Sequence, residues 1–249
     1  MVDIKEIVCR EKSFINEAEY YSNKYQIPVN SISSKNCYID ISFENSLVFK
    51  ENRISNLFHK DPFFRRVKNY QREIMLKKAI SYQIGKPKRV LDATAGLGRD
   101  GFILATLGCQ VTLIERNPVV WALVDDAIKR ANSTPWFHAL KLKLFNNEAV
   151  HYLSQANLQQ NPPDVIYCDP MFPENKNSAL VKKEMRILRQ LVGDDLDTAD
   201  VLELSLQVAS KRVVVKRHIH APFLNTRTPS LQIKGKSSRY DVYLCSPQK

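Results

Sequence analysis

The stretch Arg89-Val-Leu-Asp-Ala-Thr-Ala-Gly-Leu-Gly-Arg-Asp-Gly101 decides the fold of this chain. A short apolar run ends at Asp92, and Gly96, Gly98 and Gly101 then match the pattern Gly-x-Gly-x-x-Gly. Glycine is needed where backbone and ligand touch, and a helix that begins there points its N-terminus at an anionic group. The stretch therefore predicts a strand, a glycine-rich turn and a helix around an adenosine-containing cofactor.

The same order of strand, turn and helix repeats towards the end of the chain. Strands are predicted at 89–92, 109–115, 140–146, 164–169 and 211–216, and helices at 99–107, 118–131, 148–155, 178–192 and 198–210. This alternation is typical of an α/β fold with a mostly parallel sheet covered on both faces. The strands predicted at 231–234 and 240–245 form a hairpin, which makes the last strand antiparallel at the edge of a seven-stranded sheet.

The first 70 residues differ in pattern and predict a small N-terminal α+β region, with the main domain over 71–249. Alternating residues between Cys37 and Phe49 indicate a half-buried hairpin with its turn at Asn45-Ser46. A helix is expected from about 70 to 82, because Gly85-Lys-Pro87 stops the pattern there. The N-terminal region is expected to contact RNA if the main domain acts on it.

The composition bounds the class of protein. The chain has 249 residues, of which 44% are hydrophobic and 25% charged, and these values exclude wholesale disorder. Five scattered cysteines without a Cys-x-x-Cys pair argue against a disulfide framework and a structural zinc site. The N-terminus lacks the order of a signal peptide, and the apolar run at 101–114 is too short for a bilayer. A cytoplasmic protein without metal or membrane contact is expected.

The charge is concentrated in two basic tracts. The net charge is +11, and Lys60–Arg89 and Lys211–Tyr240 each carry a net charge of +8, so the remainder is acidic. Such tracts favour a polyanionic partner, although a solvated basic face would have the same composition. The residues expected to contact RNA are Arg65, Arg66, Lys216 and Arg217.

Polar residues follow the next two predicted strands, at the edge where such sheets bind ligands. Glu115 ends the second strand, and its carboxylate can accept both hydroxyl groups of a ribose. Asn146-Asn-Glu-Ala149 follows the third strand, where either an adenine contact or a helix cap would need such residues. Asp92, three residues and then Gly-x-Gly form an arrangement similar to that of class I S-adenosylmethionine methyltransferases.

The turn Asp169-Pro-Met-Phe-Pro173 after the fourth strand suits methyl transfer to an exocyclic amino group of a base. The lone pair of such an amine is delocalised into the ring, so the amine is a poor nucleophile. Hydrogen bonds to the Asp169 carboxylate and a backbone carbonyl can localise the lone pair and stabilise the developing positive charge. Pro170 makes the turn rigid, and Phe172 could stack on the base. These three residues are the predicted catalytic group.

Longer motifs carry a resemblance to a known family. They are Val90–Asp100, Glu115-Arg-Asn-Pro-Val-Val120, Asp169–Pro173, Ser178-Ala-Leu-Val-Lys-Lys-Glu-Met-Arg186 and Lys211-Arg-Val-Val-Val-Lys-Arg217. From Arg89 to the C-terminus the chain resembles the RsmJ family, whereas residues 1–88 match loosely. Members of that family are bacterial enzymes that methylate 16S ribosomal RNA.

The resemblance implies a Rossmann-like class I methyltransferase fold and S-adenosylmethionine as cofactor. It also implies methyl transfer to N2 of guanine 1516 near the 3′ end of 16S ribosomal RNA, with that RNA or the small ribosomal subunit as partner. Asp92, Gly96 and Gly98 of the glycine-rich turn are expected to bind the cofactor. Carried over by position, the resemblance adds further cofactor-binding residues, which are Arg99, Asp100, Glu115, Arg116, Glu148, Ala149 and Asp169.

Three alternatives stay open on the sequence. An adenine-N6 methyltransferase of nucleic acid would share the Asp-Pro turn and its chemistry. An NAD-dependent oxidoreductase would share the glycine-rich turn, but it leaves Asp169–Pro173 and the basic tracts without a role. An RNA-binding protein without activity would keep the fold, although every expected site position is filled here.

Overall fold

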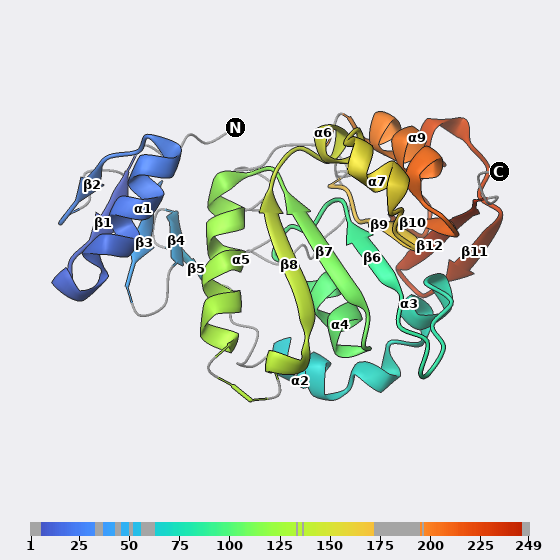
Figure 1. The fold of residues 1–249 in the computed structure, drawn as a ribbon, viewed down its shortest axis with the longest axis horizontal. Coiled ribbons are helices and arrows are strands. Elements are labelled where there is room, and N and C mark those ends of the chain that lie inside the picture. The colour runs from blue at the N-terminus through green and yellow to red at the C-terminus, as the bar shows by residue number, and fades with distance from the viewer. Residues whose placement is uncertain are drawn as a thin grey trace.

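The computed structural model describes residues 6–32, 37–42, 46–49, 52–55, 63–132, 134–135, 137–171, 195 and 197–245. They form a five-stranded sheet near the N-terminus and a seven-stranded sheet that carries most of the chain (Figure 1). The predicted helix at 178–192 and Phe172 lie outside the described residues. Within the described part, no helix is long and apolar enough to cross a membrane.

The seven-stranded sheet has the order β11-β12-β10-β9-β6-β7-β8. Its strands are β6 (Arg89–Asp92), β7 (Gln110–Glu115), β8 (Lys141–Asn146), β9 (Val165–Cys168), β10 (Arg212–His218), β11 (Leu231–Lys234) and β12 (Ser238–Leu244). The strands β6 to β10 pair in parallel, and β12 is antiparallel to both of its neighbours. The predicted α/β fold class is therefore confirmed. The last strand is not outermost as expected, because β11 pairs with its free side and takes the edge.

The chain order reverses between β6 and β9. From β6 the chain runs through β7 to β8 on one side, and it then crosses to β9 and β10 on the other side. Ligands of open α/β sheets bind in the crevice at the carboxyl ends of the strands beside such a reversal. The turns after β6 and β9 therefore face the position where a ligand is expected.

Helices cover both faces of this sheet (Figure 1). One layer contains α3 (Ile74–Ala79), α4 (Arg99–Thr106) and α5 (Pro118–Ala131), and the other contains α6 (Ala149–Leu153), α7 (Ala156–Gln160) and α9 (Thr198–Val208). Neighbouring residues of β6 confirm the two layers, since Val90 packs in the first core and Leu91 in the second. The predicted start of α5 is also confirmed, because the Asn117 side chain caps it.

Two predicted helices are shorter than expected. The helix predicted from about 70 to 82 is a 3-10 turn (Tyr70–Arg72) followed by α3, with the break at Glu73. Glu73 has ψ 53°, outside the helical range, and its carboxylate accepts two hydrogen bonds from Arg66. The helix predicted at 148–155 is α6, which ends at Leu153; Gln155 is in extended backbone, and α7 begins after it, beyond the predicted range.

The N-terminal sheet has the order β2-β1-β3-β4-β5. It consists of β1 (Ile7–Cys9), β2 (Val29–Asn30), β3 (Cys37–Ile41), β4 (Ser46–Phe49) and β5 (Asn52–Ser55), with α1 (Ile15–Tyr25) packed beside them. The antiparallel pairing of β3 with β4 confirms the predicted hairpin. One core joins this sheet and α1 to α5, and within it the Tyr21 hydroxyl donates to Asp125 at 3.1 Å. A boundary at residue 70 stays a prediction, since α2 (Phe63–Lys68) packs against α4.

Candidate active site

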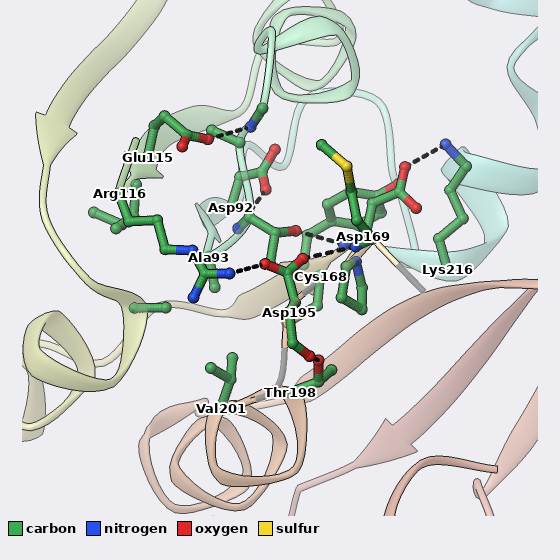
Figure 2. A pocket seen from close by; sticks show the side chains of 18 of the residues that line it. Asp92, Ala93, Glu115, Arg116, Cys168, Asp169, Asp195, Thr198, Val201 and Lys216 are labelled. Carbon is green, nitrogen blue, oxygen red and sulfur yellow. Dashed lines mark hydrogen bonds and ion pairs between the residues drawn. The ribbon is translucent and has the colours of Figure 1, made fainter. Parts of the chain in front are cut away.

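A cavity of about 290 Å³ opens at the carboxyl ends of β6, β7, β9 and β10 (Figure 2). It brings together most of the residues predicted from the sequence. Of the predicted cofactor and catalytic positions, the lining contains Asp92, Gly96, Arg99, Asp100, Glu115, Arg116, Glu148, Ala149, Asp169 and Pro170. Gly98 is not in the lining, but it forms the turn that ends at α4.

The glycine-rich turn has the backbone that its sequence predicts. Gly96 has φ +52° and Gly98 has φ +71°, values in the left-handed region that favours glycine. Gly101 serves close packing instead, because a Cβ atom there would lie 2.3 Å from Leu113 Cδ2 and 3.2 Å from Asp92 Oδ2. Asp92 itself is buried, and removal from water raises its pKa well above the usual value.

Glu115 ends β7 and closes the turn from the other side. Its Oε2 accepts the backbone N–H of Gly96 at 2.8 Å, and its Oε1 accepts that of Asn117 at 2.7 Å. Burial raises the pKa of Glu115 to about 7, although the two backbone hydrogen bonds oppose this shift. Each carboxylate oxygen can accept more than one hydrogen bond, so the group can still receive two ribose hydroxyls.

Arg116 fastens the opposite wall of the cavity. Its guanidinium pairs with Asp195 and, at 3.1 Å, with Asp197 at the start of α9, and it lies 3.8 Å from Glu148. Asp195 in turn accepts the backbone N–H of Met171 at 2.7 Å. Figure 2 shows Asp195 between Arg116 and the turn after β9. Arg116, which was predicted to bind the cofactor, thus lies in the wall of the cavity, and aspartates already pair with its charge.

Asp169 follows β9 and is held through its backbone and its side chain. Its N–H donates to Thr94 Oγ1 at 2.6 Å, which ties the turn after β9 to the turn after β6. Its Oδ2 accepts from Lys216 Nζ at 2.7 Å. Pro170 is buried directly after it. The predicted catalytic carboxylate therefore lies where the two strands beside the reversal end.

Asp100 has three partners of its own. Its Oδ2 accepts from the Tyr167 hydroxyl at 2.6 Å and from Lys216 Nζ at 2.8 Å, and its Oδ1 lies 2.7 Å from Arg66 Nη1. Burial alone would raise the pKa of Asp100, but the two cations hold it below its usual value. Arg66 and Lys216 come from the two basic tracts, so Asp100 joins residues of both tracts.

Most of the four basic residues predicted to contact RNA do not lie on an open surface. Arg217 is only 4% exposed and donates to the carbonyl of Pro222, so it does not lie on the open surface where an RNA contact was expected. Arg66 and Lys216 line the cavity and pair with carboxylates. Only Arg65, among the four predicted positions, is exposed. A count of charges cannot distinguish a surface arginine from one that holds a loop.

Sequence reasoning missed three residues of this site. Tyr167 could have been found, because strand alternation places it with Val165 and away from Ile166. Thr94 lies inside the motif, but no pattern showed that it would bind the turn after β9. Asp195 comes from an acidic run before α9 and had no signal of its own. Among the described residues, no group of three or more His, Cys, Asp or Glu side chains could hold a metal ion.

Comparisons with known proteins agree with this geometry. The family model described as "Putative SAM-dependent methyltransferase" matches residues 43–245. Ribosomal RNA small subunit methyltransferase J of Pseudoalteromonas translucida is 51% identical over 176 residues, which cover 69% of this chain and 68% of that protein. The protein of the same name from Coxiella burnetii is 42% identical over 247 residues, 94% of each chain.

A solved structure extends the likeness to the whole fold. The crystal structure of a SAM-dependent methyltransferase from Neisseria gonorrhoeae has a TM-score of 0.76 and is 29% identical. It covers 96% of this chain and 95% of its own. Together with the glycine-rich turn, Glu115 and the Asp-Pro turn around one cavity, these matches establish the family. The chain belongs to the SAM-dependent methyltransferase family that includes ribosomal RNA small subunit methyltransferase J.

Proposed function

We propose that this enzyme transfers a methyl group from S-adenosylmethionine to N2 of guanine 1516 in the 16S RNA of the small ribosomal subunit. The observation that carries the proposal is Asp169, whose carboxylate lies on a rigid turn beside the glycine-rich turn of the cofactor site. The names of the relatives support ribosomal RNA as the substrate.

The residues at the turn after β6 fit the cofactor. Gly96 leaves no side chain where the ligand approaches, and the buried Glu115 offers its carboxylate to the ribose hydroxyls. Glu148 and Ala149 line the side of the cavity where the adenine would lie. Bound S-adenosylmethionine would supply a methyl group on a positively charged sulfur, and that charge would favour the ionised form of the carboxyl groups that line the cavity, such as Asp92.

Asp169 is the group proposed to act on the base. Its carboxylate accepts an N–H of the exocyclic amine, which localises the nitrogen lone pair toward the methyl group. In transfer to that nitrogen, the methyl group would leave the cofactor's sulfur, which would keep the electrons of the broken bond, and Asp169 would accept the proton that the amine loses and pass it to water. Pro170 and the Thr94 hydrogen bond keep the turn fixed during this step.

The RNA itself is proposed to reach the cavity across the exposed side of α2, which presents Arg65. Residues 1–70 then contribute to RNA binding next to the main domain. A ribosomal substrate supports a location in the cytoplasm, where small subunits are assembled. Naked RNA, a partial subunit and a complete subunit would all offer phosphates to such a surface.

Nucleoside analysis tests the proposed function directly. The purified enzyme and labelled S-adenosylmethionine are incubated with small subunits, or their RNA, from cells that lack the enzyme. Labelled N2-methylguanosine at one site is expected. Labelled N6-methyladenosine would instead support the adenine alternative, and bound RNA without any label would support a binding protein without activity.

The raised pKa of Glu115 predicts a pH-dependent affinity for the cofactor. The side chain ionises as the pH passes about 7, and a carboxylate accepts hydrogen bonds more strongly than a neutral acid. Calorimetry should show binding of S-adenosylmethionine that tightens between about pH 6 and pH 8, with proton release. Glu115→Gln should bind about tenfold more weakly at the upper pH and lose this dependence. An equal slope in both proteins would contradict the assignment.

The same shift predicts the opposite trend for the stability of the free protein. The carboxyl is protonated more readily in the folded state than in the unfolded chain, since its folded pKa is about 7 and its ordinary value is 4.5. Its contribution to stability is therefore complete below about pH 4.5 and declines as the pH rises through 7. As the pH rises, cofactor affinity should therefore increase while the stability of the free protein falls, so tighter binding cannot be explained by a more stable protein.

A further inference from the structure

Lys216 joins two carboxylates that come from different parts of the fold. Its Nζ lies 2.8 Å from Asp100 Oδ2 and 2.7 Å from Asp169 Oδ2. Lys216 belongs to β10, Asp100 to the first turn of α4, and Asp169 to the turn after β9. Figure 2 shows the lysine side chain reaching toward Asp169 at the edge of the cavity.

Asp100 is fixed firmly enough to serve as an anchor for this lysine. Its side chain is 10% exposed and is bound by the Tyr167 hydroxyl at 2.6 Å and Arg66 Nη1 at 2.7 Å. Arg66 is itself held by Glu73, with Nε 2.7 Å from Oε1. The ammonium of Lys216 therefore has a defined position, and so does the Asp169 oxygen that it binds.

We propose that Lys216 is a positioning residue for methyl transfer, which keeps the Asp169 carboxylate ionised and directed at the incoming amine. This inference rests on the proposed function. It replaces the expectation that Lys216 contacts an RNA phosphate, because the ammonium is already engaged by two carboxylates inside the cavity.

The charges around Asp169 show why a cation is needed there. The Asp169 side chain is 41% exposed, and its partial removal from water raises its pKa, while Lys216 is the strongest of the influences that oppose the rise. The titratable groups that face this cluster are Arg66 on α2, Asp100 on α4, Asp92 at the end of β6, Tyr167 on β9 and Tyr240 on β12. Without Lys216, the largest effect of a neighbouring charge on the pKa of Asp169 would come from Asp100, whose negative charge raises that pKa.

Lys216 is not itself a base in this arrangement. Burial alone would lower the pKa of Lys216, but Asp169 and Asp100 raise it far above its usual value. The lysine therefore stays protonated at neutral pH, and the proton lost by the amine leaves through Asp169. Its effect on the reaction passes entirely through the carboxylate that it holds.

The test compares Lys216→Met and Lys216→Arg with a matched control, Lys211→Met. Lys211 pairs with Asp164 at 2.8 Å. Asp164 directly precedes β9 and Lys211 directly precedes β10, so this pair lies at the end of the sheet opposite the cavity. For each protein, kcat and KM for RNA are measured across pH. In Lys216→Met the acid limb of kcat should move upward by about one pH unit or more, since a nearby like charge raises the pKa of a carboxyl.

Two further results are expected if Lys216 acts through Asp169. Activity of Lys216→Met should recover toward alkaline pH, and Lys216→Arg should return the acid limb toward its wild-type position. Lys211→Met should leave the profile unchanged. NMR titration of labelled aspartate carboxyls in the free proteins should show the same upward shift for Asp169, so this readout does not depend on activity.

Other outcomes would overturn the inference. A loss of kcat that is equal at every pH would make Lys216 merely structural, and a rise in KM for RNA with an unmoved acid limb would make it an RNA contact. An Asp169 titration that is the same in wild type and Lys216→Met would also contradict it. A wild-type protein that methylates no guanine would contradict the proposed function, whereas the NMR result would still decide the role of Lys216.

Discussion

Asp169→Asn should lower kcat for methyl transfer by about a hundredfold or more, because proton acceptance by a positioned group contributes about that much. Asparagine fills the same volume and still accepts one hydrogen bond, but it cannot take the proton or stabilise the positive charge on the amine. Affinity for S-adenosylmethionine should change by less than about tenfold, since this interaction strengthens toward the transition state. Single-turnover kinetics with saturating cofactor measure the effect.

Asp164→Asn is the matched control for this prediction. Asp164 directly precedes β9, as Asp169 directly follows it, and each aspartate pairs with a lysine of the neighbouring segment. The control should keep near wild-type kcat, because its ion pair lies at the end of the strand opposite the cavity. Near wild-type turnover by Asp169→Asn would make Asp169 a residue of the turn only.

Gly101→Ala should cause the largest loss of stability among single methyl additions at this site. The new Cβ would lie 2.3 Å from Leu113 Cδ2, and Leu113 is fully buried, so the leucine side chain or the helix α4 has to shift within a packed core. Overpacking of this kind costs about 1–3 kcal/mol, which lowers the melting temperature of a chain this long by about 2–12 °C. Because α4 begins at the glycine-rich turn, cofactor affinity should fall as well.

A double-mutant cycle with Leu113→Ala checks the cause. Leu113→Ala alone should cost about 2–5 kcal/mol through the cavity that it leaves. Adding Gly101→Ala in that background should cost much less than it does in the wild type, because the atom it would meet is gone. Two independent, additive losses would mean that the crowding is with another group, such as the Asp92 carboxylate.

The architecture of the main sheet could be predicted because its signals are local. The run ending at Asp92, the glycines that follow and the Asn117-Pro118 cap each act within a few residues, and the strands and α5 formed where expected. The order of the last two strands depends instead on which of them pairs with β10. That choice is made by long-range pairing, which a pattern along the chain does not contain.

The site divides along the same line. Asp92, Glu115 and Asp169 stand at strand ends, so topology alone brings them together. The partners of each charge follow from packing in three dimensions, and sequence reasoning therefore placed Lys216 and Arg217 on the surface. Arg217 on β10 is buried and bonded to the carbonyl of Pro222, so a run of basic residues in the sequence can lie in the interior of the fold.

The link from Glu73 through Arg66 to Asp100 bears on how the chain could be shortened. A fragment that begins at residue 71 would keep the whole seven-stranded sheet, yet it would lack Arg66 and with it one of the two cations on Asp100. It would also expose the face of α5 that packs against α1 and β1. The early part of the chain therefore supplies both apolar packing for α5 and a cation that pairs with Asp100 in the cavity.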